Sequence, residues 1–500
     1  MLRCILAVFR QDTHRGIIKT KKENRNMNRA PDYSSSKKQF DFYAYSGPNA
    51  GAWRVDGETF SVGQDFRTVE RFKEYKDAGM TIYFPQTSAR IDKETPNKDW
   101  ESVKLIWDKA YQAGLNKIIA WDSRIMALSQ KTESLIGEGK LFADEDQLVQ
   151  YIRDCLALYN NHPAFYGVML TDEPKYTQVV AYGQTYRAIK KAMPSCFVQY
   201  NLLPMFNYQP MVESFYPPID GLVGTREAQA MARYKLYLEQ FIDATGADYV
   251  MYDHYPMTVR GIRDCYLPCM QIAAQVSKEK KVNFYYVAGT FEMTVKGELE
   301  NRRIDEKDAR WLNNTMLAYG VKQIGYFTYF TKGDNRSDGE TFVDGGSFIT
   351  RHGEKTDIYY FMQKIMAENQ AFAPVILNFD YQQGTVYKAM RPEEVETPQS
   401  HIALMTEYCK FEKLKKISCD KEFGLVTELL DTQSGQYMYA AVNLVNPHVA
   451  VGKQTVEMTF DGEYTSALVY QNGKGVQVPL VENKLVFELT AGDAVYVLPY

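Results

Sequence analysis

Residues 165–174, FYGVMLTDEP, run from aromatic and aliphatic side chains into an acidic pair that stops at a proline. The apolar part has the length of a buried strand, and a proline cannot continue the hydrogen-bond ladder of a central strand. An apolar strand that becomes polar only at its end is typical of parallel sheets, because helices cover both faces of such sheets. The stretch therefore predicts a buried parallel strand with Glu173 at its carboxyl end.

The same pattern repeats on both sides of this strand, with eight apolar runs that alternate with helical periodicity. The predicted strands are residues 40–45, 80–84, 117–121, 165–171, 196–203, 248–253, 283–289 and 325–329. The predicted helices are residues 66–78, 100–113, 144–159, 176–193, 231–245, 266–280, 306–319 and 355–368. Eight such units predict an α/β fold, a (β/α)8 TIM barrel over residues 39–372. An open doubly wound sheet is the alternative, but the glycines of residues 46–51, SGPNAG, do not match its phosphate-binding fingerprint.

The two ends of the chain depart from this alternation of strands and helices. After Pro374, short alternating runs separated by turns such as Asn472-Gly473 replace the helical periodicity, and they predict an antiparallel β-sandwich over residues 375–500. The predicted strands there are residues 425–430, 437–444, 455–460, 467–470, 484–489 and 494–498. Residues 1–38 are basic and polar after a short apolar run, so we expect them to be disordered. That run, residues 4–9, is shorter than a signal-peptide core, and the sequence leaves open whether the protein is periplasmic, extracellular or retained in the cell.

The composition narrows the class of ligand. Lys and Arg total 58 against 62 Asp and Glu, so the net charge of −4 provides no field that would gather nucleic acid. No apolar stretch approaches the roughly 20 residues of a membrane span. The seven cysteines do not suggest a disulfide framework, and Cys265 and Cys269 read as buried thiols. The six histidines include no His-x-His pair, so we expect neither a metal nor an organic cofactor.

Two glutamates stand at the ends of predicted strands that face each other across the barrel. Glu173 ends the fourth strand, and Glu292 follows the seventh. Catalytic groups of barrel enzymes lie at the carboxyl ends of the strands. A pair of carboxyls suits cleavage of a glycosidic bond, because one gives a proton to the leaving oxygen while the other attacks the anomeric carbon or activates water. The alternative is that each is a solvated loop residue.

Three segments carry a resemblance to a known group of enzymes. Residues 166–174, YGVMLTDEP, residues 282–292 and residues 75–81, YKDAGMT, resemble strand motifs of the clan A glycoside hydrolases, and the likeness covers residues 40–366. The resemblance implies a retaining double displacement on a β-linked oligo- or polysaccharide, with Glu173 as acid/base and Glu292 as nucleophile. It also implies that Tyr255 hydrogen-bonds Glu292. Asp172 stands where the clan usually has Asn, and an ionised Asp172 would raise the pKa of Glu173.

Other residues at predicted strand ends complete the expected sugar-binding set. Asp172 would accept a hydrogen bond from a sugar hydroxyl, or cap the next helix. Each of the others has a structural role as its alternative, such as helix capping for Asp122 or a place in the core for Trp121. The remaining predicted substrate-binding residues are Tyr255, His254, Asp122, Trp53, Trp121, Tyr45, Asn201 and Tyr329.

Two departures from the clan keep a second hypothesis open. Residues 80–86 lack the Arg that the clan often carries on its second strand, and Tyr329 and Phe330 stand where its eighth strand usually ends in Trp. The alternative function is a non-catalytic carbohydrate-binding barrel. A barrel enzyme of another class is a third hypothesis, disfavoured because no Lys ends a predicted strand as a Schiff-base candidate. The sugar, the linkage and the oligomeric state are not encoded in any recognisable pattern.

Overall fold

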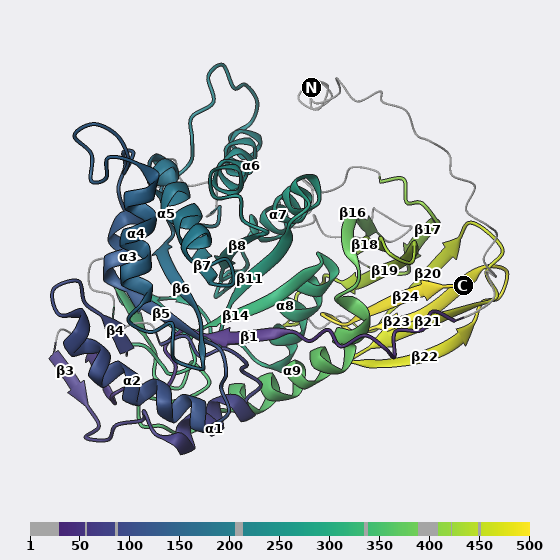
Figure 1. Ribbon diagram of the computed structural model, residues 1–500. Coiled ribbons are helices and arrows are strands. Elements are labelled where there is room, and N and C mark those ends of the chain that lie inside the picture. Colours follow the sequence, from purple (N-terminus) through teal and green to yellow (C-terminus); the bar gives the residue numbers. More distant parts are fainter. Residues whose placement is uncertain are drawn as a thin grey trace.

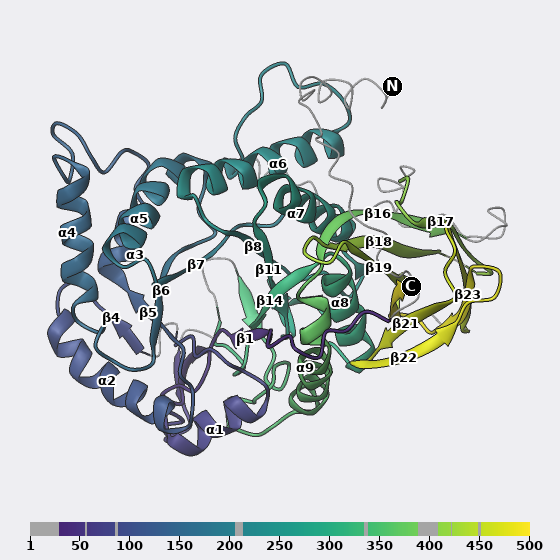
Figure 2. The same ribbon diagram turned by 45° about the vertical axis from the view of Figure 1, so that its right-hand side comes forward.

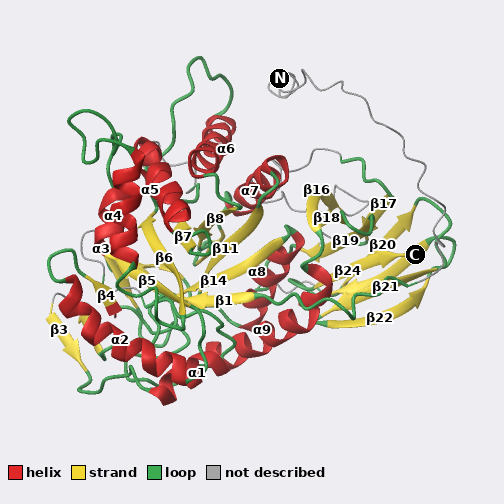
Figure 3. Cartoon of the chain, viewed as in Figure 1, coloured by secondary structure: helices red, strands yellow, loops and turns green. Residues whose placement is uncertain are grey.

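The computed structural model describes residues 30–55, 58–85, 89–205, 214–334, 339–388, 409–421, 423–448 and 452–500. It is a mixed α/β protein in which helices surround the strands of the first part of the chain (Figures 1 and 2). Past residue 380 the described chain holds only strands and loops (Figure 3). Among the helices in the described ranges, none is long and apolar enough to cross a membrane.

The first part alternates strands and helices as the sequence predicts. The strands of this alternation are β1 (Asp41–Ala44), β5 (Ile118–Asp122), β6 (Phe165–Asp172), β7 (Phe197–Asn201), β8 (Tyr249–His254), β11 (Asn283–Gly289) and β14 (Val321–Phe327). The helices are α1 (Val69–Asp77), α2 (Pro96–Gln112), α4 (Glu145–Leu156), α5 (Val179–Ala192), α6 (Arg226–Thr245), α7 (Tyr266–Lys280), α8 (Glu306–Ala318) and α9 (Asp357–Ile376). A 3-10 turn, Tyr176–Gln178, precedes α5.

These strands form two parallel four-stranded sheets. Their orders are β1-β14-β11-β8 and β4-β5-β6-β7, where β4 is the short strand Arg90–Ile91. A parallel bridge between Leu202 and Tyr252 links β7 to β8. On the other side, Tyr83 bridges to Ile118 of β5. Since all the pairs within these two sheets are parallel, the carboxyl ends of the strands share one end of the fold, where candidate site residues should be sought.

The predicted second strand, residues 80–84, is not a strand in the structure. Only Tyr83 makes a bridge, and the amides of both Thr81 and Ile82 donate to the carbonyl of Phe42. The segment still lies between β1 and β5, with Ile82 and Tyr83 buried. It occupies the expected place in the order without the regular ladder of a strand.

The loops that follow the strands contain additional helices and strands. They are α3 (Ser123–Ser129), the hairpin β2 (Ala52–Val55) and β3 (Glu58–Ser61), and the strands β9 (Met257–Thr258), β10 (Gly261–Ile262), β12 (Met293–Val295), β13 (Glu298–Asn301) and β15 (Glu340–Phe342). The last five form one sheet in the order β10-β9-β13-β12-β15. This loop sheet draws on the segments after β8, β11 and β14, so it lies at their carboxyl ends. The sequence analysis did not predict it.

The last part of the chain forms two antiparallel sheets. The strands are β16 (Asp380–Lys388), β17 (Leu414–Cys419), β18 (Phe423–Asp431), β19 (Gln436–Asn443), β20 (Gln454–Phe460), β21 (Ser466–Gln471), β22 (Lys474–Pro479), β23 (Lys484–Leu489) and β24 (Ala494–Pro499). The larger sheet has the order β16-β18-β19-β24-β21-β22, and the smaller one has the order β17-β20-β23. All six strands that the sequence predicts in this region are present, and β16, β17 and β22 were missed.

The middle of the larger sheet is buried on both faces, whereas its edge strand β22 is mostly exposed. Along β19, Met438, Ala440 and Val442 belong to the core shared with the helices, whereas Tyr439 and Ala441 belong to a second core shared with the smaller sheet. This arrangement follows from the alternation of side chains along a strand. It explains why the strand has an almost continuous apolar sequence.

The amino-terminal segment was predicted to be disordered as far as residue 38. Residues 1–29 lie outside the described residues. Residues 30–38 have no helix or strand, but Tyr33 is anchored. Its ring lies 5.6 Å from that of Phe379, and its hydroxyl donates to Asp431 over 3.2 Å. The expectation of disorder is therefore wrong around Tyr33.

Candidate active site

The end of β6 is held in place from three directions. The amide of Glu173 donates to the carbonyl of Asn201 over 2.9 Å. The hydroxyls of Tyr182 on α5 and Tyr237 on α6 donate to the carbonyls of Thr171 and Pro174, over 2.9 and 2.6 Å. Glu173 has a φ of +45°, a left-handed conformation that costs free energy in a residue with a side chain. Such strain persists only where the surroundings enforce it, and it concentrates at functional sites.

Three carboxyls meet at this point, and we call them the carboxyl cluster: Asp172, Glu173 and Asp253. The pairing of β6 with β7 sets Asp172 beside Asn201, whose side-chain amide donates to Asp172 over 3.1 Å. Asp253, on β8, lies within hydrogen-bonding reach of Glu173, of the Asn201 amide and of the Tyr255 hydroxyl. The cluster thus combines side chains from the ends of β6 and β8, and Asn201 on the intervening β7 links them.

The environment raises the pKa of every carboxyl in the cluster. Burial, followed by the charges of Asp253 and Asp172, raises the pKa of Glu173 well above its ordinary value. Burial and then the charge of Asp253 raise the pKa of Asp172 to about 7. Burial also raises the pKa of Asp253, against the hydrogen bonds of Tyr255 and Asn201 that lower it. Carboxyls this close cannot all ionise at neutral pH, so the cluster retains protons there.

The three carboxyls differ in their access to solvent. Asp172 is exposed, Glu173 is half-buried, and Asp253 is only 3% exposed. Water therefore solvates the charged form of Asp172 better than that of Glu173. A ligand can touch Asp172 and Glu173, whereas Asp253 acts on it only through its neighbours.

Aromatic rings lie beneath the cluster. Tyr45 is 1% exposed, and its ring centroid lies 4.8 Å from that of Phe84 and 5.6 Å from that of Phe327. Phe84 in turn lies 5.7 Å from the half-buried Trp121. The charges of all three cluster carboxyls act on Tyr45, which places this predicted site residue close to them. Tyr45 therefore forms part of the floor of the site rather than a stacking surface.

Trp53 belongs to the β2–β3 hairpin and is half-buried. Its ring lies 6.3 Å from Phe60 and 6.4 Å from both Phe66 and Phe330. The ring is thus packed into an aromatic group next to the segment that follows β14. One part of it stays accessible, as a stacking role for Trp53 requires.

Three predicted sugar-binding residues are buried in other roles. Asp122 has no exposed surface, caps α3, and accepts hydrogen bonds from Arg124 and Tyr159. His254 is also fully buried, with its ring 5.7 Å from that of Tyr266 on α7. Tyr329 has no exposed surface and packs on Tyr75, Phe330 and Phe348. The prediction that these three bind substrate is wrong, because no ligand can reach them in this structure.

Glu292 lies between β11 and β12 and is half-buried. Its carbonyl accepts a hydrogen bond from the amide of Val343 over 3.0 Å. Its neighbour Phe291 packs edge-on against Tyr255, with ring centroids 4.9 Å apart. Tyr255 connects this segment to the carboxyl cluster, since its hydroxyl acts on Asp253. The expected partner of Tyr255 was Glu292, and Asp253 takes that place.

The sequence analysis missed Asp253 and Lys332. Asp253 ends the predicted sixth strand, so the rule that identified Glu173 also pointed to it. Lys332 follows β14, and its ammonium lies 4.9 Å above the ring of Phe327 and 5.5 Å above that of Phe342. Its positive charge lowers the pKa of Asp172. A lone lysine in a loop gives no sequence signal of this kind.

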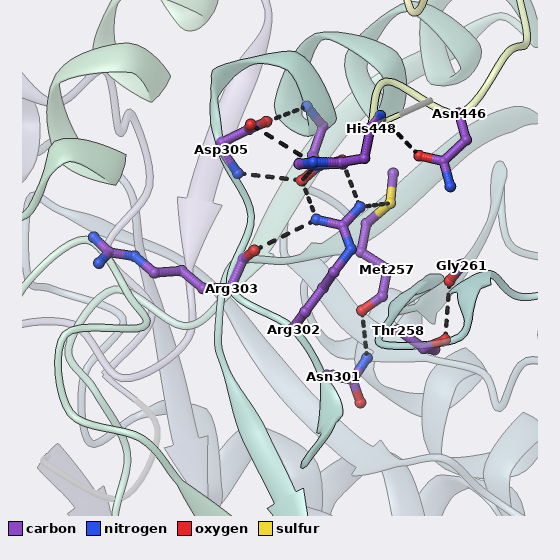
Figure 4. A network of polar contacts seen from close by, with 10 residues as sticks. Met257, Thr258, Gly261, Asn301, Arg302, Arg303, Asp305, Asn446 and His448 are labelled. Carbon is purple, nitrogen blue, oxygen red and sulfur yellow. Dashed lines mark hydrogen bonds and ion pairs between the residues drawn. The ribbon is translucent and has the colours of Figure 1, made fainter. Parts of the chain in front are cut away.

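A second polar group lies away from the carboxyl cluster, at the amino end of α8 (Figure 4). Asp305, Asp308 and His448 place one ligand atom each within 4.8 Å of one another. Asp308, however, has no exposed side-chain surface, and both its oxygens accept from Arg302. His448, from the loop after β19, adds a contact of 3.0 Å. The group is therefore a polar network that ties the last part of the chain to α8, and both oxygens of Asp308 are engaged in it.

Replacing Arg302 with methionine is expected to destabilise the protein by about 3 kcal/mol, because it leaves the buried carboxylate of Asp308 without its main partner. Burial alone would raise the pKa of Asp308, but the hydrogen bond and charge of Arg302, together with the hydrogen bonds of His448 and Asp305, hold that pKa below its ordinary value. The stabilisation is therefore present above the unfolded carboxyl's pKa and is lost as the pH falls through the folded one. Urea denaturation at neutral and acidic pH measures both effects.

Arg303 provides the matched control for this prediction. It pairs with Asp357, and both side chains are largely exposed, so Arg303→Met is expected to cost less than about 1 kcal/mol. Equal losses of stability in the two variants would contradict the assignment of a buried ion pair at Asp308.

Comparison with known proteins gives matches in structure only. No protein-family model matches the chain, and no curated protein matches it. The solved structures that resemble it include a GH30 endoxylanase from Clostridium papyrosolvens C71, with 12% identity, 93% of this chain and 98% of that chain covered, and a TM-score of 0.38. A GH27 β-L-arabinopyranosidase from Geobacillus stearothermophilus has 10% identity, coverage of 93% and 97%, and a TM-score of 0.44.

A third similar structure is an endo-β-1,4-mannanase from Thermotoga petrophila. It has 10% identity, coverage of 92% and 99%, and a TM-score of 0.38. At such identities and TM-scores, the likeness by itself establishes neither the fold nor the activity of this chain. The case for a function rests on the geometry of the carboxyl cluster.

Proposed function

We propose that the protein is a glycoside hydrolase that cleaves a β-linked glycosidic bond, with Glu173 as its general acid. The observation that carries this proposal is the placement of Glu173, a half-buried side chain at the end of β6 that a ligand can reach. Burial and the charges of Asp253 and Asp172 raise its pKa well above the ordinary value. A general acid must be protonated at the working pH and must release its proton as the bond breaks, and a raised pKa favours the protonated form.

In the first step, Glu173 gives its proton to the leaving oxygen while the carboxylate of Glu292 attacks the anomeric carbon. The bond to the leaving group breaks, and a glycosyl ester of Glu292 forms. In the second step, the Glu173 carboxylate takes a proton from water, and the water oxygen displaces Glu292 from the anomeric carbon. Two displacements retain the anomeric configuration, and Glu173 and Glu292 return to their starting states.

Other residues would bind the sugar. Asp172 is exposed beside Glu173 and can accept a hydrogen bond from a hydroxyl group. The half-buried rings of Trp53 and Trp121 can stack on the apolar face of a sugar ring. A polymeric or oligomeric carbohydrate is the partner we propose, and the proposal needs no cofactor.

The architecture that we propose for this function is a closed (β/α)8 barrel over residues 39–372, followed by a β-sandwich over residues 375–500. The bridges at Tyr83 and Leu202 and the hydrogen bonds from Thr81 and Ile82 to Phe42 support closure of the strands into a ring. The core shared by the two carboxyl-terminal sheets supports the sandwich. In such a barrel, β6 and β11 stand opposite each other.

Hydrolysis of a panel of β-linked oligosaccharides and polysaccharides tests the proposal. We expect new reducing ends, and NMR of the first-formed product is expected to show the β-anomer. An α-anomer would make Glu292 a base that activates water instead of a nucleophile. Affinity for sugars without turnover, unchanged in Glu173→Gln, would favour the non-catalytic carbohydrate-binding barrel.

A further inference from the structure

Asp253 is a carboxyl in a place where burial disfavours charge. Its side chain is 3% exposed, on a strand whose other residues are all buried. One of its oxygens, Oδ1, is buried without a hydrogen-bond partner among the described residues, and so is Oδ1 of the adjacent Asn201. A buried acceptor that stays unsatisfied destabilises the fold, because it has lost its hydrogen bonds to water and gained none in return. A further interaction is therefore needed to offset the free energy of burying the Asp253 carboxyl at this point.

Glu173 is the group that can satisfy Asp253. The two carboxyls lie within hydrogen-bonding reach of each other, and a protonated carboxyl is a donor. The backbone of Glu173 is fixed by the hydrogen bond from its amide to Asn201, so its side chain starts from a defined position. Asn201 thus contacts the carboxyl ends of both β6 and β8. Its carbonyl accepts from Glu173, and its side chain reaches Asp172 and Asp253.

We propose that Asp253 is a positioning residue for the acid: its buried carboxylate accepts a hydrogen bond from the protonated carboxyl of Glu173 and holds that carboxyl toward the exposed side of the site. The inference rests on the proposed role of Glu173 and extends it to a residue that no substrate touches. Asp253 keeps the proton on Glu173 until the glycosidic bond begins to break, when the leaving oxygen gains negative charge and becomes basic enough to take the proton.

The electrostatics agree with this arrangement. After burial, the charge of Asp253 is the largest contribution that raises the pKa of Glu173, larger than that of Asp172. The other ionisable groups around the pair come from every surrounding element. They are Tyr43 and Tyr45 on β1, Asp172 on β6, Tyr234 and Tyr237 on α6, His254 and Tyr255 at the end of β8, Tyr286 on β11, Lys332 after β14, and Glu340 on β15.

The tyrosines in this set do not titrate in the working range, because burial raises the pKa of each of them. Asp172 is the group whose charge competes most with that of Asp253 for control of Glu173. A variant of Asp172 is therefore the right comparison for a variant of Asp253.

Asp253→Asn in the full-length protein tests the proposal. The change removes the negative charge and keeps the shape, so the pKa of Glu173 should fall by about one unit or more, the usual effect of losing a charged neighbour. Carboxyl-¹³C NMR of labelled glutamate follows that titration, and the signal of Glu173 is assigned as the one missing from Glu173→Gln. The basic limb of the pH profile of kcat/KM should move to lower pH by the same amount.

Asp172→Asn is expected to give a smaller shift of the Glu173 titration. A midpoint of Glu173 that stays unchanged or rises in Asp253→Asn would overturn the proposal, and so would a larger shift in Asp172→Asn. Asp253→Ser carries the same expectation and replaces Asp253→Asn if that variant does not fold. If the wild type cleaves no glycoside, the NMR titration still decides the role of Asp253, and only the proposed function fails.

Discussion

Glutamine in place of Glu173 is expected to lower kcat/KM for glycosides with poor leaving groups by about 10²–10⁴-fold, the usual contribution of a positioned general acid. The amide has the size of the carboxyl but has no acidic proton to give. The segment that carries it is fixed by Asn201, Tyr182 and Tyr237 through backbone atoms, so the substitution should leave the fold intact. Initial rates with alkyl and with nitrophenyl glycosides measure the effect.

The leaving group separates a lost acid from a damaged site. A nitrophenolate leaves without protonation, so its glycosides should lose far less of the first step than alkyl glycosides do. The wild-type rate should also fall as the pH rises through the raised pKa of Glu173, and Glu173→Gln should lack that limb. Equal losses for both leaving groups, or an unchanged pH profile, would count against Glu173 as the acid.

Segments with a strong and uniform pattern could be predicted from the sequence to the residue. The helix α7 and the strand β11 have the predicted bounds, since each contains a clear apolar run that polar or glycine residues delimit. The segment at residues 80–84 shows the limit of this reasoning. It is as apolar as a strand, but its ladder depends on the register of β1 and β5, which its own residues do not determine.

The last helix runs further than the sequence analysis predicts. We expected it to stop at residue 368, and a proline usually ends a helix. Instead α9 continues to Ile376, with Phe372, Ala373 and Val375 buried around the proline. Burial between the helices and the larger sheet outweighs one missing hydrogen bond near the helix end. The larger sheet supplies this burial. Most of its strands lie more than 60 residues further along the sequence, so a local sequence pattern cannot reveal the contact.

The candidate site was predictable in part because the carboxyl ends of parallel strands lie at the same end of the fold. That rule found Glu173 and Asp172, but it cannot tell which face of a strand a residue occupies. On β8, His254 packs outward against α7, while Asp253 faces the other two members of the carboxyl cluster. Successive residues alternate between faces, so an error of one position exchanges a structural residue for a functional one. For Asp122 the sequence left two roles open, and the structure shows the helix-capping one.

The second carboxylate of the reaction is open to a direct test. Glu292→Gln is expected to lower the rate at least about 10³-fold, because an amide cannot form the glycosyl ester and the loss of a nucleophile removes the step itself. The segment is well fixed, since Val343 donates to its carbonyl and a side chain on Gly346 would come within 2.6 Å of its amide nitrogen. Glu298→Gln is the matched control, an exposed glutamate of the same loop sheet, and should keep wild-type rates.

The two glutamine variants should differ in their response to the leaving group. Loss of Glu173 is relieved by a leaving group that needs no proton, whereas loss of Glu292 is not, because every substrate requires attack at the anomeric carbon. Full activity of Glu292→Gln on all substrates that the wild type cleaves would contradict its role. In that case Asp172 becomes the better second carboxylate, since it is the exposed member of the carboxyl cluster. Asp172→Asn would then have to abolish the hydrolysis that Glu292→Gln retains.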